Sequence, residues 1–281
     1  MKTFNNTDGI QAYLLSLKAK NKRIGFVPTM GALHPGHISL IEQCRKENEV
    51  CVASIFVNPT QFNDKEDLER YPRTLGADSA MLERAGCDVL FAPPVEEVYP
   101  QVGINNKWQQ VDLGELDSVM EGAHRPGHFK GVIQVVSRLF DIVEPHRAYF
   151  GQKDFQQLAV IREMTRQLNY PVQIIACPTM RENDGLAMSS RNMRLTPGER
   201  KEAPKISRVL FKVKELAKER SVEELKRFAV DELNKEKLFT LEYFEIADAA
   251  TLQPAKDLSK PAVACVALKL GAVRLIDNIS L

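Results

Sequence analysis

Residues 24–37 read Ile-Gly-Phe-Val-Pro-Thr-Met-Gly-Ala-Leu-His-Pro-Gly-His. The apolar run at the start predicts a β-strand that stops at Pro28, and the apolar periodicity from Ile38 onward predicts a helix. The segment is therefore expected to form a strand, a glycine-bearing turn and a helix start. Ligands of open α/β sheets bind at this end of a strand. The free N–H groups of a helix start favour an anion, most often phosphate.

Two histidines, His34 and His37, lie three residues apart at the predicted helix start, and side chains at this spacing share one face of a helix. Gly31 and Gly36 have the spacing of a P-loop, but the Lys and the Ser or Thr that should follow them are absent, and so is a dinucleotide GxGxxG motif. The imidazoles can stabilise charge during phosphoryl or nucleotidyl transfer. Two other interpretations are ordinary capping histidines and a metal pair, although no third ligand with suitable spacing is evident.

Strand and helix patterns alternate along the first two thirds of the chain. Val50–Val57 is almost wholly apolar, as expected of a strand that is buried on both faces within a parallel sheet. Further strands are predicted at 88–92, 147–150 and 172–177, and helices at 8–20, 75–85, 131–143 and 155–168. This alternation implies right-handed crossovers, so the predicted fold class is α/β with a Rossmann-like, doubly wound parallel sheet.

A change of pattern near Thr196-Pro197-Gly198 predicts a smaller C-terminal domain. Charged helices are expected at 198–219 and 221–235, followed by β-like runs at 240–246, 262–270 and 273–279. Helices followed by strands are typical of an α+β domain. We therefore divide the chain into a Rossmann-like domain, residues 1–184, and an α+β domain, residues 185–281.

An irregular segment, 93–130, connects a predicted strand to the next helix and contains the only tryptophan, Trp108. A stretch of this length without clear periodicity predicts a working loop, such as a lid. His124, Arg125 and His128 are candidate lid residues, although a solvated loop is the favoured interpretation for all three.

The composition excludes several classes of protein. The chain has 281 residues with a formal net charge of +1, which gives no support for nucleic acid as the main partner. Its five cysteines are scattered without a CxxC motif, as is typical of reduced thiols in the cytosol. No apolar run is long enough to span a membrane. The polar start of the chain does not resemble a signal peptide, so we expect a cytoplasmic protein.

Four motif blocks, taken together, are similar to the signatures of one enzyme family. They are residues 28–37 (Pro-Thr-Met-Gly-Ala-Leu-His-x-Gly-His), 58–62 (Asn-Pro-Thr-Gln-Phe), 151–157 (Gly-Gln-Lys-Asp-Phe-Gln-Gln) and 181–192 (Arg-Glu-x-Asp-Gly-Leu-Ala-Met-Ser-Ser-Arg-Asn). The set resembles the pantothenate synthetase (pantoate–β-alanine ligase) family, within the nucleotidyltransferase superfamily that shares His-x-Gly-His with class I aminoacyl-tRNA synthetases. The fourth block stands where those synthetases carry KMSKS.

The resemblance implies a two-step ligase reaction that uses ATP and Mg²⁺. The carboxylate of (R)-pantoate attacks the α-phosphate of ATP and releases pyrophosphate, and the amine of β-alanine then attacks the pantoyl adenylate and releases AMP. Neither step needs a covalent enzyme nucleophile, so catalysis should depend on positioning and on charge stabilisation. The family also implies a homodimer, and a C-terminal domain that closes over the site.

The resemblance further implies roles for individual residues. ATP is expected to contact Met30, Gly31, His34, Gly36, His37, Gly151, Gln152, Lys153, Asp154, Met180, Met188, Ser189, Ser190 and Arg191. The candidate catalytic residues among them are His34, His37, Lys153 and Arg191. The substrates (R)-pantoate and β-alanine are expected at Asn58, Gln61 and Gln157. Asp154 is expected to orient Mg²⁺ or the ribose, and no protein side chain is assigned as a metal ligand.

Each of these roles has a purely structural alternative. Asp154 and Gln157 have capping-box spacing and can cap the helix at 155–168, while Lys153 and Asp154 can form a surface ion pair. Residues 189–191 can be a polar turn. At the level of the whole protein, the alternatives are another adenylate-forming member of the superfamily, an RNA-binding module derived from a synthetase core, and a non-catalytic homologue.

Overall fold

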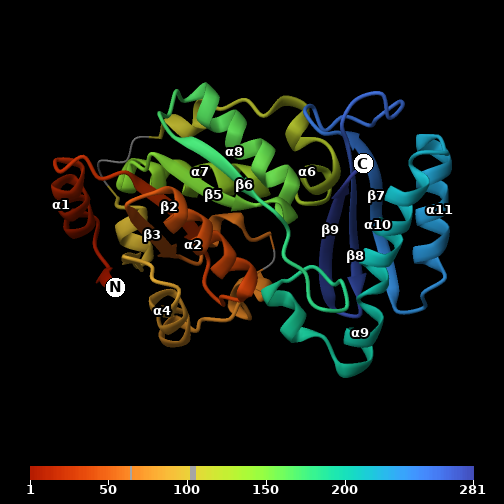
Figure 1. Ribbon diagram of the computed structural model, residues 1–281, viewed down its shortest axis with the longest axis horizontal. Helices are drawn as coiled ribbons and strands as arrows, with labels where there is room; N and C mark the ends of the chain where they lie inside the picture. The colour runs from red at the N-terminus through yellow and green to blue at the C-terminus, as the bar shows by residue number, and fades with distance from the viewer. Residues whose placement is uncertain (64, 102–105) are drawn as a thin grey trace. The chain divides into compact units, whose positions relative to one another are not determined.

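The computed structural model describes residues 1–63, 65–101 and 106–281, and it divides into two compact units (Figure 1). The N-terminal unit comprises residues 1–117, 125–152 and 157–178, and the C-terminal unit comprises residues 118–124, 153–156 and 179–281. These two names are used below. The functional division into residues 1–184 and 185–281, with closure of the second part, stays a prediction.

The N-terminal unit is built on a six-stranded parallel sheet. Its strands are β1 (Lys2–Phe4), β2 (Ile24–Thr29), β3 (Val50–Ile55), β4 (Val89–Phe91), β5 (Arg147–Gly151) and β6 (Gln173–Cys177). Their order is β1-β4-β3-β2-β5-β6, and every neighbouring pair is parallel. The order reverses between β2 and β5, which is the switch point where ligands of such sheets bind. The doubly wound sheet is confirmed; β1 escaped prediction because three residues show no periodicity.

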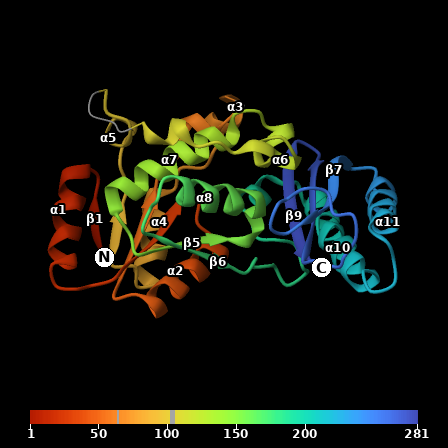
Figure 2. The same ribbon diagram turned by 90° about the horizontal axis from the view of Figure 1, so that it is seen from above.

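Helices cover both faces of this sheet (Figure 2). The longer ones are α1 (Thr7–Lys18), α2 (Pro35–Glu47), α4 (Leu75–Arg84), α7 (His128–Val143) and α8 (Phe155–Gln167). Helices α1, α7 and α8 pack on one face, and α2 and α4 pack on the other. Phe26 points into the first of these cores and Val27 into the second, because successive strand residues face opposite ways.

The predicted loop at 93–130 contains short helices in its described parts. These are α5 (Val95–Val98), two 3-10 helices (Lys107–Gln110 and Gly114–Asp117) and α6 (Met120–His124); helix α3 (Lys65–Glu69) lies earlier in the chain. Residues 102–105 of the predicted lid lie outside the described residues. The proposed movement of this segment stays a prediction.

The C-terminal unit contains an antiparallel sheet in the order β7 (Phe239–Asp248), β8 (Ala262–Leu270) and β9 (Val273–Ser280). Helices α10 (Lys205–Leu216) and α11 (Val222–Asn234) share an apolar core with it. The single helix predicted at 198–219 is wrong: α9 (Pro197–Glu202) ends before Pro204, and α10 begins after it. A proline has no N–H to continue the helix, and its ring clashes with the preceding turn. None of the helices in the described ranges is long and apolar enough to cross a membrane.

Candidate active site

The start of α2 places the two histidines in a reciprocal cap. The Nδ1 atom of His34 accepts a hydrogen bond from the backbone N–H of Gly36 at 3.2 Å, and Nδ1 of His37 accepts one from the N–H of His34 at 3.3 Å. The ring centroids lie 4.0 Å apart. A ring that accepts at Nδ1 carries its proton on Nε2. The capping interpretation is therefore correct, and each ring that accepts at Nδ1 bears its N–H at Nε2.

A buried carboxylate holds the turn between β2 and α2. Gly31 and Ala32 have φ angles of +81° and +50°, and the left-handed conformation costs about 1–2 kcal/mol at a residue with a Cβ atom. Asp78 of α4 is 2% exposed and accepts hydrogen bonds from the N–H groups of Ala32, at 3.0 Å, and Leu33, at 2.8 Å. The hydroxyl of Thr74 donates to the same carboxylate at 3.1 Å. Asp78 thus fixes the backbone that leads into the histidines.

The second block begins with an asparagine whose side chain is fully engaged. Asn58 is 0% exposed. Its Oδ1 accepts hydrogen bonds from the N–H and the hydroxyl of Thr60 and, at 2.9 Å, from the hydroxyl of Tyr99. Its Nδ2 donates to Gly131 O at 3.2 Å and to Gln61 Oε1 at 3.1 Å. This geometry favours Asn58 as the residue that orients Gln61.

Gln61 is held from three sides within the N-terminal unit. Besides its bond from Asn58, its Nε2 lies 3.2 Å from the sulfur of Met30. The backbone carbonyl oxygen of Gln61 lies 2.8 Å from Nδ1 of His128. A carbonyl oxygen can only accept a hydrogen bond, so His128 is protonated at Nδ1. Nε2 of His128 lies 3.1 Å from a guanidinium nitrogen of Arg125. The solvated-loop interpretation is wrong for His128, which is 6% exposed at the first position of α7.

The third block follows β5 and is divided between the units. Gly151, Gln152 and Gln157 belong to the N-terminal unit, and Lys153 and Asp154 to the C-terminal unit. The ammonium of Lys153 lies 4.0 Å from Asp154 Oδ2, the outer limit of an ion pair, and a partly exposed pair of this length contributes little to stability. The predicted ion pair is therefore present but weak.

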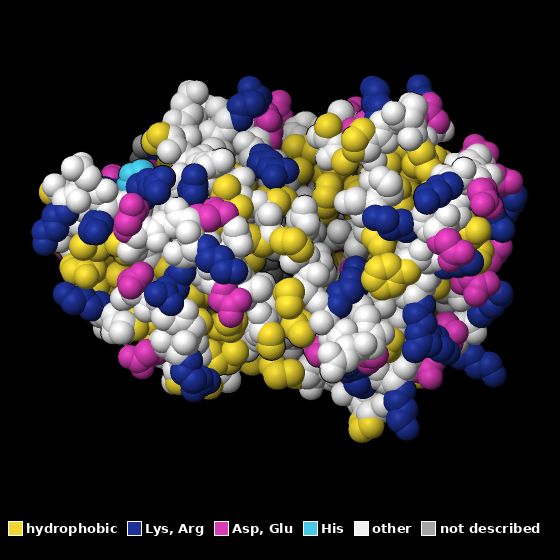
Figure 3. Space-filling view, viewed as in Figure 1, with side chains coloured by type: hydrophobic (Ala, Val, Ile, Leu, Met, Phe, Trp, Pro, Cys, Tyr) yellow, Lys and Arg dark blue, Asp and Glu magenta, His cyan; other side chains and the backbone are white. Residues whose placement is uncertain are grey.

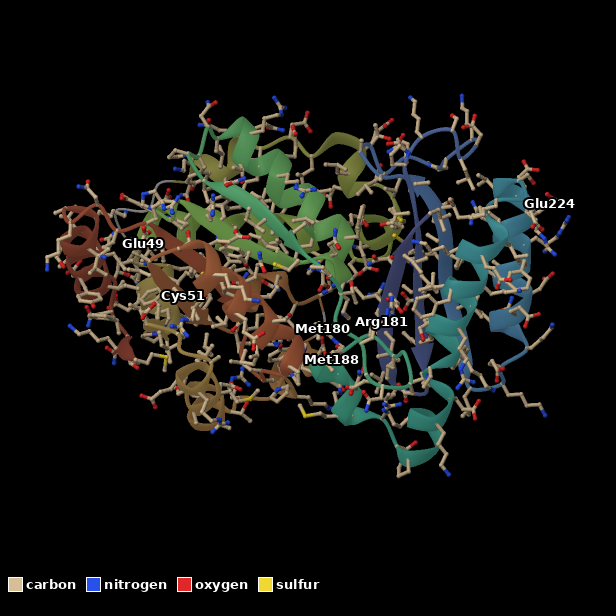
Figure 4. The ribbon with its side chains drawn as sticks, in the orientation of Figure 1. Glu49, Cys51, Met180, Arg181, Met188 and Glu224 are labelled. Carbon is tan, nitrogen blue, oxygen red and sulfur yellow. The ribbon has the colours of Figure 1, made fainter. Side chains whose placement is uncertain are left out.

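The fourth block is a tight hairpin in the C-terminal unit. Met188 N–H donates to Met180 O at 2.9 Å, and Arg181 is bridged to Ala187 (Figure 4). A turn at Gly185, whose φ is +95°, closes the hairpin. Met180 is 41% exposed, so it is not part of an apolar core.

A 3-10 helix, Ser190–Arg194, continues from this hairpin. Ser189 caps it by accepting a hydrogen bond from Arg191 N–H at 3.3 Å. The polar-turn interpretation of residues 189–191 is therefore compatible with ligand binding, because a capping hydroxyl oxygen still has its own O–H to donate.

Each unit thus gathers part of the predicted site. The N-terminal unit joins Met30, His34, His37, Asn58 and Gln61 through the turns that follow β2 and β3. The C-terminal unit holds the fourth block and the pair Lys153 and Asp154.

Sequence reasoning missed Asp78, and it considered His128 only as a lid or solvated loop residue, not as a support for Gln61. A weak signal existed for Asp78, an acid four residues before the core residue Leu82 on an otherwise amphipathic helix. The signal for His128 was its place at the start of the strongly apolar segment that forms α7.

A doubly wound parallel sheet with a His-x-Gly-His helix start after its central strand defines a Rossmann-like nucleotidyltransferase. The family model described as pantoate-beta-alanine ligase matches residues 2–280. The chain is 53% identical to a pantothenate synthetase of Bacteroides fragilis (strain YCH46), over 99% of this chain and 98% of that protein. It therefore belongs to the pantoate–β-alanine ligase family.

Further relatives and solved structures agree. A pantothenate synthetase of Porphyromonas gingivalis (strain ATCC 33277) is 52% identical, over 99% of each chain. The crystal structure of pantothenate synthetase from Thermus thermophilus has a TM-score of 0.91 at 46% identity, over 99% of both chains. The pantoate-beta-alanine ligase from Francisella tularensis, complexed with beta-gamma ATP and beta-alanine, has a TM-score of 0.79 at 36% identity, over 99% of this chain and 97% of that one.

The predicted family, fold class and ligase activity are confirmed. The reaction of the family is the ATP-dependent condensation of (R)-pantoate with β-alanine to pantothenate through a pantoyl adenylate, with release of AMP and pyrophosphate. The residue roles inferred from the sequence stay predictions.

Proposed function

We propose that His34 and His37 stabilise the transition state in which the pantoate carboxylate attacks the α-phosphate of ATP. The new bond joins a carboxylate oxygen to the α-phosphorus, and the bond to the pyrophosphate oxygen breaks. The carboxylate has no proton to lose, so this step needs no general base. The reciprocal cap at the start of α2 supports the proposal, because it fixes the orientation of both rings and places their N–H groups at Nε2. Such fixed donors lower the energy of developing negative charge.

ATP is further held, in this proposal, by the residues of the third and fourth blocks. Lys153 and Arg191 supply positive charge, and the hydroxyls of Ser189 and Ser190 supply donors for phosphate oxygens. The remaining contacts are assigned to Met30, Gly31, Gly36, Gly151, Gln152, Asp154, Met180 and Met188. The Francisella complex with beta-gamma ATP and beta-alanine supports ATP and β-alanine as ligands of this chain.

Pantoate is assigned to Gln61 and Gln157, with Asn58 acting through Gln61. The side-chain oxygen of Gln61 accepts a hydrogen bond from Asn58, and its backbone carbonyl accepts one from His128. A side chain restrained in this way loses little conformational entropy when a ligand binds. These restraints support a fixed acceptor and donor for the substrate hydroxyls.

Mg²⁺ is proposed to accompany ATP, and Asp154 fits a role beside it. Its carboxylate is half-exposed, and Mg²⁺ in such enzymes takes one or two carboxylates and keeps substrate phosphates and waters as its other ligands. Across residues 1–63, 65–101 and 106–281, no cluster of three or more His, Cys, Asp or Glu that could hold a metal is present. The metal would add positive charge at the phosphates.

Cytoplasmic location and a homodimer are proposed from the family alone. Figure 3 shows Lys and Arg side chains interspersed with Asp and Glu on the face that it displays, which fits the small net charge and small-molecule substrates. Sedimentation equilibrium at micromolar concentration tests the dimer: a molecular mass of twice 31.7 kDa is expected, and a mass near 31.7 kDa contradicts it.

The experiment that tests the proposed mechanism follows an oxygen isotope. Pantoate carrying ¹⁸O in its carboxylate is turned over with ATP and β-alanine, and phosphorus NMR locates the label. Attack on the α-phosphate transfers one ¹⁸O to AMP. Label in orthophosphate, with ADP as the other product, would overturn the proposal in favour of an acyl phosphate. Pyrophosphate exchange into ATP that does not need pantoate would instead indicate a different adenylate-forming enzyme.

A further inference from the structure

Two adjacent residues of β9, Asp277 and Asn278, bind to two different motif blocks. Asp277 forms an ion pair with Arg181, the first residue of the fourth block, and the Asn278 side chain donates to the carbonyl of Lys153 in the third block. Successive side chains of a strand point to opposite faces, so neighbours on one strand can reach separate segments. All four residues belong to the C-terminal unit.

The contact between Asp277 and Arg181 is a two-pronged ion pair. The guanidinium donates to Asp277 Oδ2 at 2.7 Å and to Oδ1 at 3.0 Å, and the aspartate is 4% exposed. Burial raises the pKa of the Asp277 carboxyl, and the positive charge of Arg181 opposes that rise. Two parallel hydrogen bonds fix the orientation of a guanidinium as well as its place. This pair therefore fixes how the Arg181 side chain lies against β9.

The rest of the Arg181 guanidinium connects β9 to the hairpin of the fourth block. It donates to Gly185 O at 3.1 Å, at the hairpin turn, and to Asn278 O at 3.2 Å, on the strand. It also lies over the ring of Phe211, 5.1 Å from the centroid. The guanidinium thus binds one carbonyl group of β9, the last strand in the order β7-β8-β9. Loss of this anchor would release the hairpin that leads to Ser189 and Arg191.

The contact between Asn278 and Lys153 fixes the other block through its backbone. Asn278 Nδ2 donates to Lys153 O at 2.8 Å. Asn278 is itself held, since it is buried, pairs with Cys265 of β8 and donates its N–H to Asp277 Oδ1 at 2.8 Å. A fixed carbonyl places the Lys153 Cα atom, and with it the base of the side chain.

We propose that Asp277 and Asn278 are positioning residues for adenylate formation, one aligning the fourth block and the other aligning Lys153. This inference rests on the proposed contact of Lys153, Ser189, Ser190 and Arg191 with the ATP phosphates. Pyrophosphate has left before β-alanine attacks, so the two residues serve the first half-reaction and not the second. A misplacement of about 1 Å can cost about 100-fold in rate.

The test compares the two half-reactions in Asp277→Asn and Asn278→Asp. Both replacements keep the volume of the side chain; the first removes the charge that pairs with Arg181, and the second removes the donor to Lys153. We expect the KM for ATP in pyrophosphate exchange to rise about tenfold or more, and the rate of adenylate formation to fall by about 100-fold. Aminolysis of preformed pantoyl adenylate by β-alanine should stay within about threefold of the wild-type rate.

A matched control in the same unit is Glu242→Gln. It removes the charge of a carboxylate that accepts a hydrogen bond from Arg274 at 2.8 Å. It should lower thermal stability and leave the KM for ATP unchanged. The inference is overturned if both positioning variants keep wild-type adenylation while Lys153→Ala and Arg191→Ala lose it. Equal losses in both half-reactions overturn it too, because they indicate a purely structural role. If Lys153→Ala and Arg191→Ala also behave as wild type, both the inference and the proposed contacts of these residues with the ATP phosphates are wrong.

Discussion

Replacement of Asp78 by asparagine should both destabilise the protein and slow adenylate formation. The carboxylate of Asp78 accepts three hydrogen bonds, from the backbone N–H groups of Ala32 and Leu33 and from the hydroxyl of Thr74. An asparagine of the same shape has one amide oxygen and one NH₂ group. The NH₂ group must then face at least one backbone N–H as a second donor.

The size of the effect follows from these contacts. A hydrogen bond to a charged group contributes about 1.5–3 kcal/mol, and a buried donor left without a partner costs about 1–3 kcal/mol. Loss of the charge and of one acceptor should therefore lower the free energy of unfolding by about 2–4 kcal/mol. Release of Ala32 from its left-handed conformation would move the turn that leads to His34, and a shift of about 1 Å would lower the rate by about 100-fold.

Urea unfolding followed by far-UV circular dichroism measures the first effect, and pantoate-dependent pyrophosphate exchange measures the second. Glu83→Gln is the matched control, the same chemical change on the same helix at a side chain that is 68% exposed. The control should lie within about 0.5 kcal/mol of wild type. The reasoning is refuted if Asp78→Asn is as stable as the control and exchanges pyrophosphate at the wild-type rate.

Three further predictions concern other parts of the chain. In Gly131→Ala, the new Cβ would lie 2.4 Å from Thr60 O and 2.7 Å from the Gln61 Cα. Displacement of Gln61 should then raise the KM for pantoate about tenfold or more and change the KM for ATP little. An unchanged KM for pantoate in steady-state assays contradicts the role of Gln61. Burial raises the pKa of Tyr99 to about 12, so its contribution to stability is complete below about pH 10 and is lost as the pH rises towards 12. The urea midpoint should therefore fall less over that pH range in Tyr99→Phe than in the wild type. An equal fall of the midpoint in both proteins would argue against a raised pKa of Tyr99. All five cysteines are buried, and burial raises the pKa of Cys177 to about 11. A thiol reagent should therefore label the protein at pH 8 only after urea is added. Rapid labelling without urea would show an accessible thiolate and contradict this prediction.

The sequence allowed the parallel sheet to be predicted because its signals are local. Val50–Val57 is almost wholly apolar, Pro28 lies one residue before the end of β2, and Gly86 follows the end of α4. The break between α9 and α10 was also marked locally, by Pro204, and was missed because the charged pattern continued across it.

The residues that hold the site could not be predicted in the same way. Asp78 contacts Ala32 across 46 positions of sequence, and Arg181 contacts Asp277 across 96. Partners so far apart meet only after the fold has formed. No local sequence pattern indicates which residue any one of the 37 acidic side chains will contact. The motif blocks pointed to candidate ligand residues, whereas the residues that align them were visible only in the structure.

The central claim is that His37 acts as an electrostatic donor at the α-phosphate. Rapid-quench measurement of pantoyl adenylate formation with α-labelled ATP tests it in the wild type, His37→Ala and His37→Gln. Alanine removes the donor and should lower the rate by about 10²–10³-fold. Glutamine restores an N–H donor but has no proton to transfer, so it should recover at least about tenfold over alanine. A glutamine variant as slow as the alanine variant, or an alanine variant at the wild-type rate, would contradict the claim.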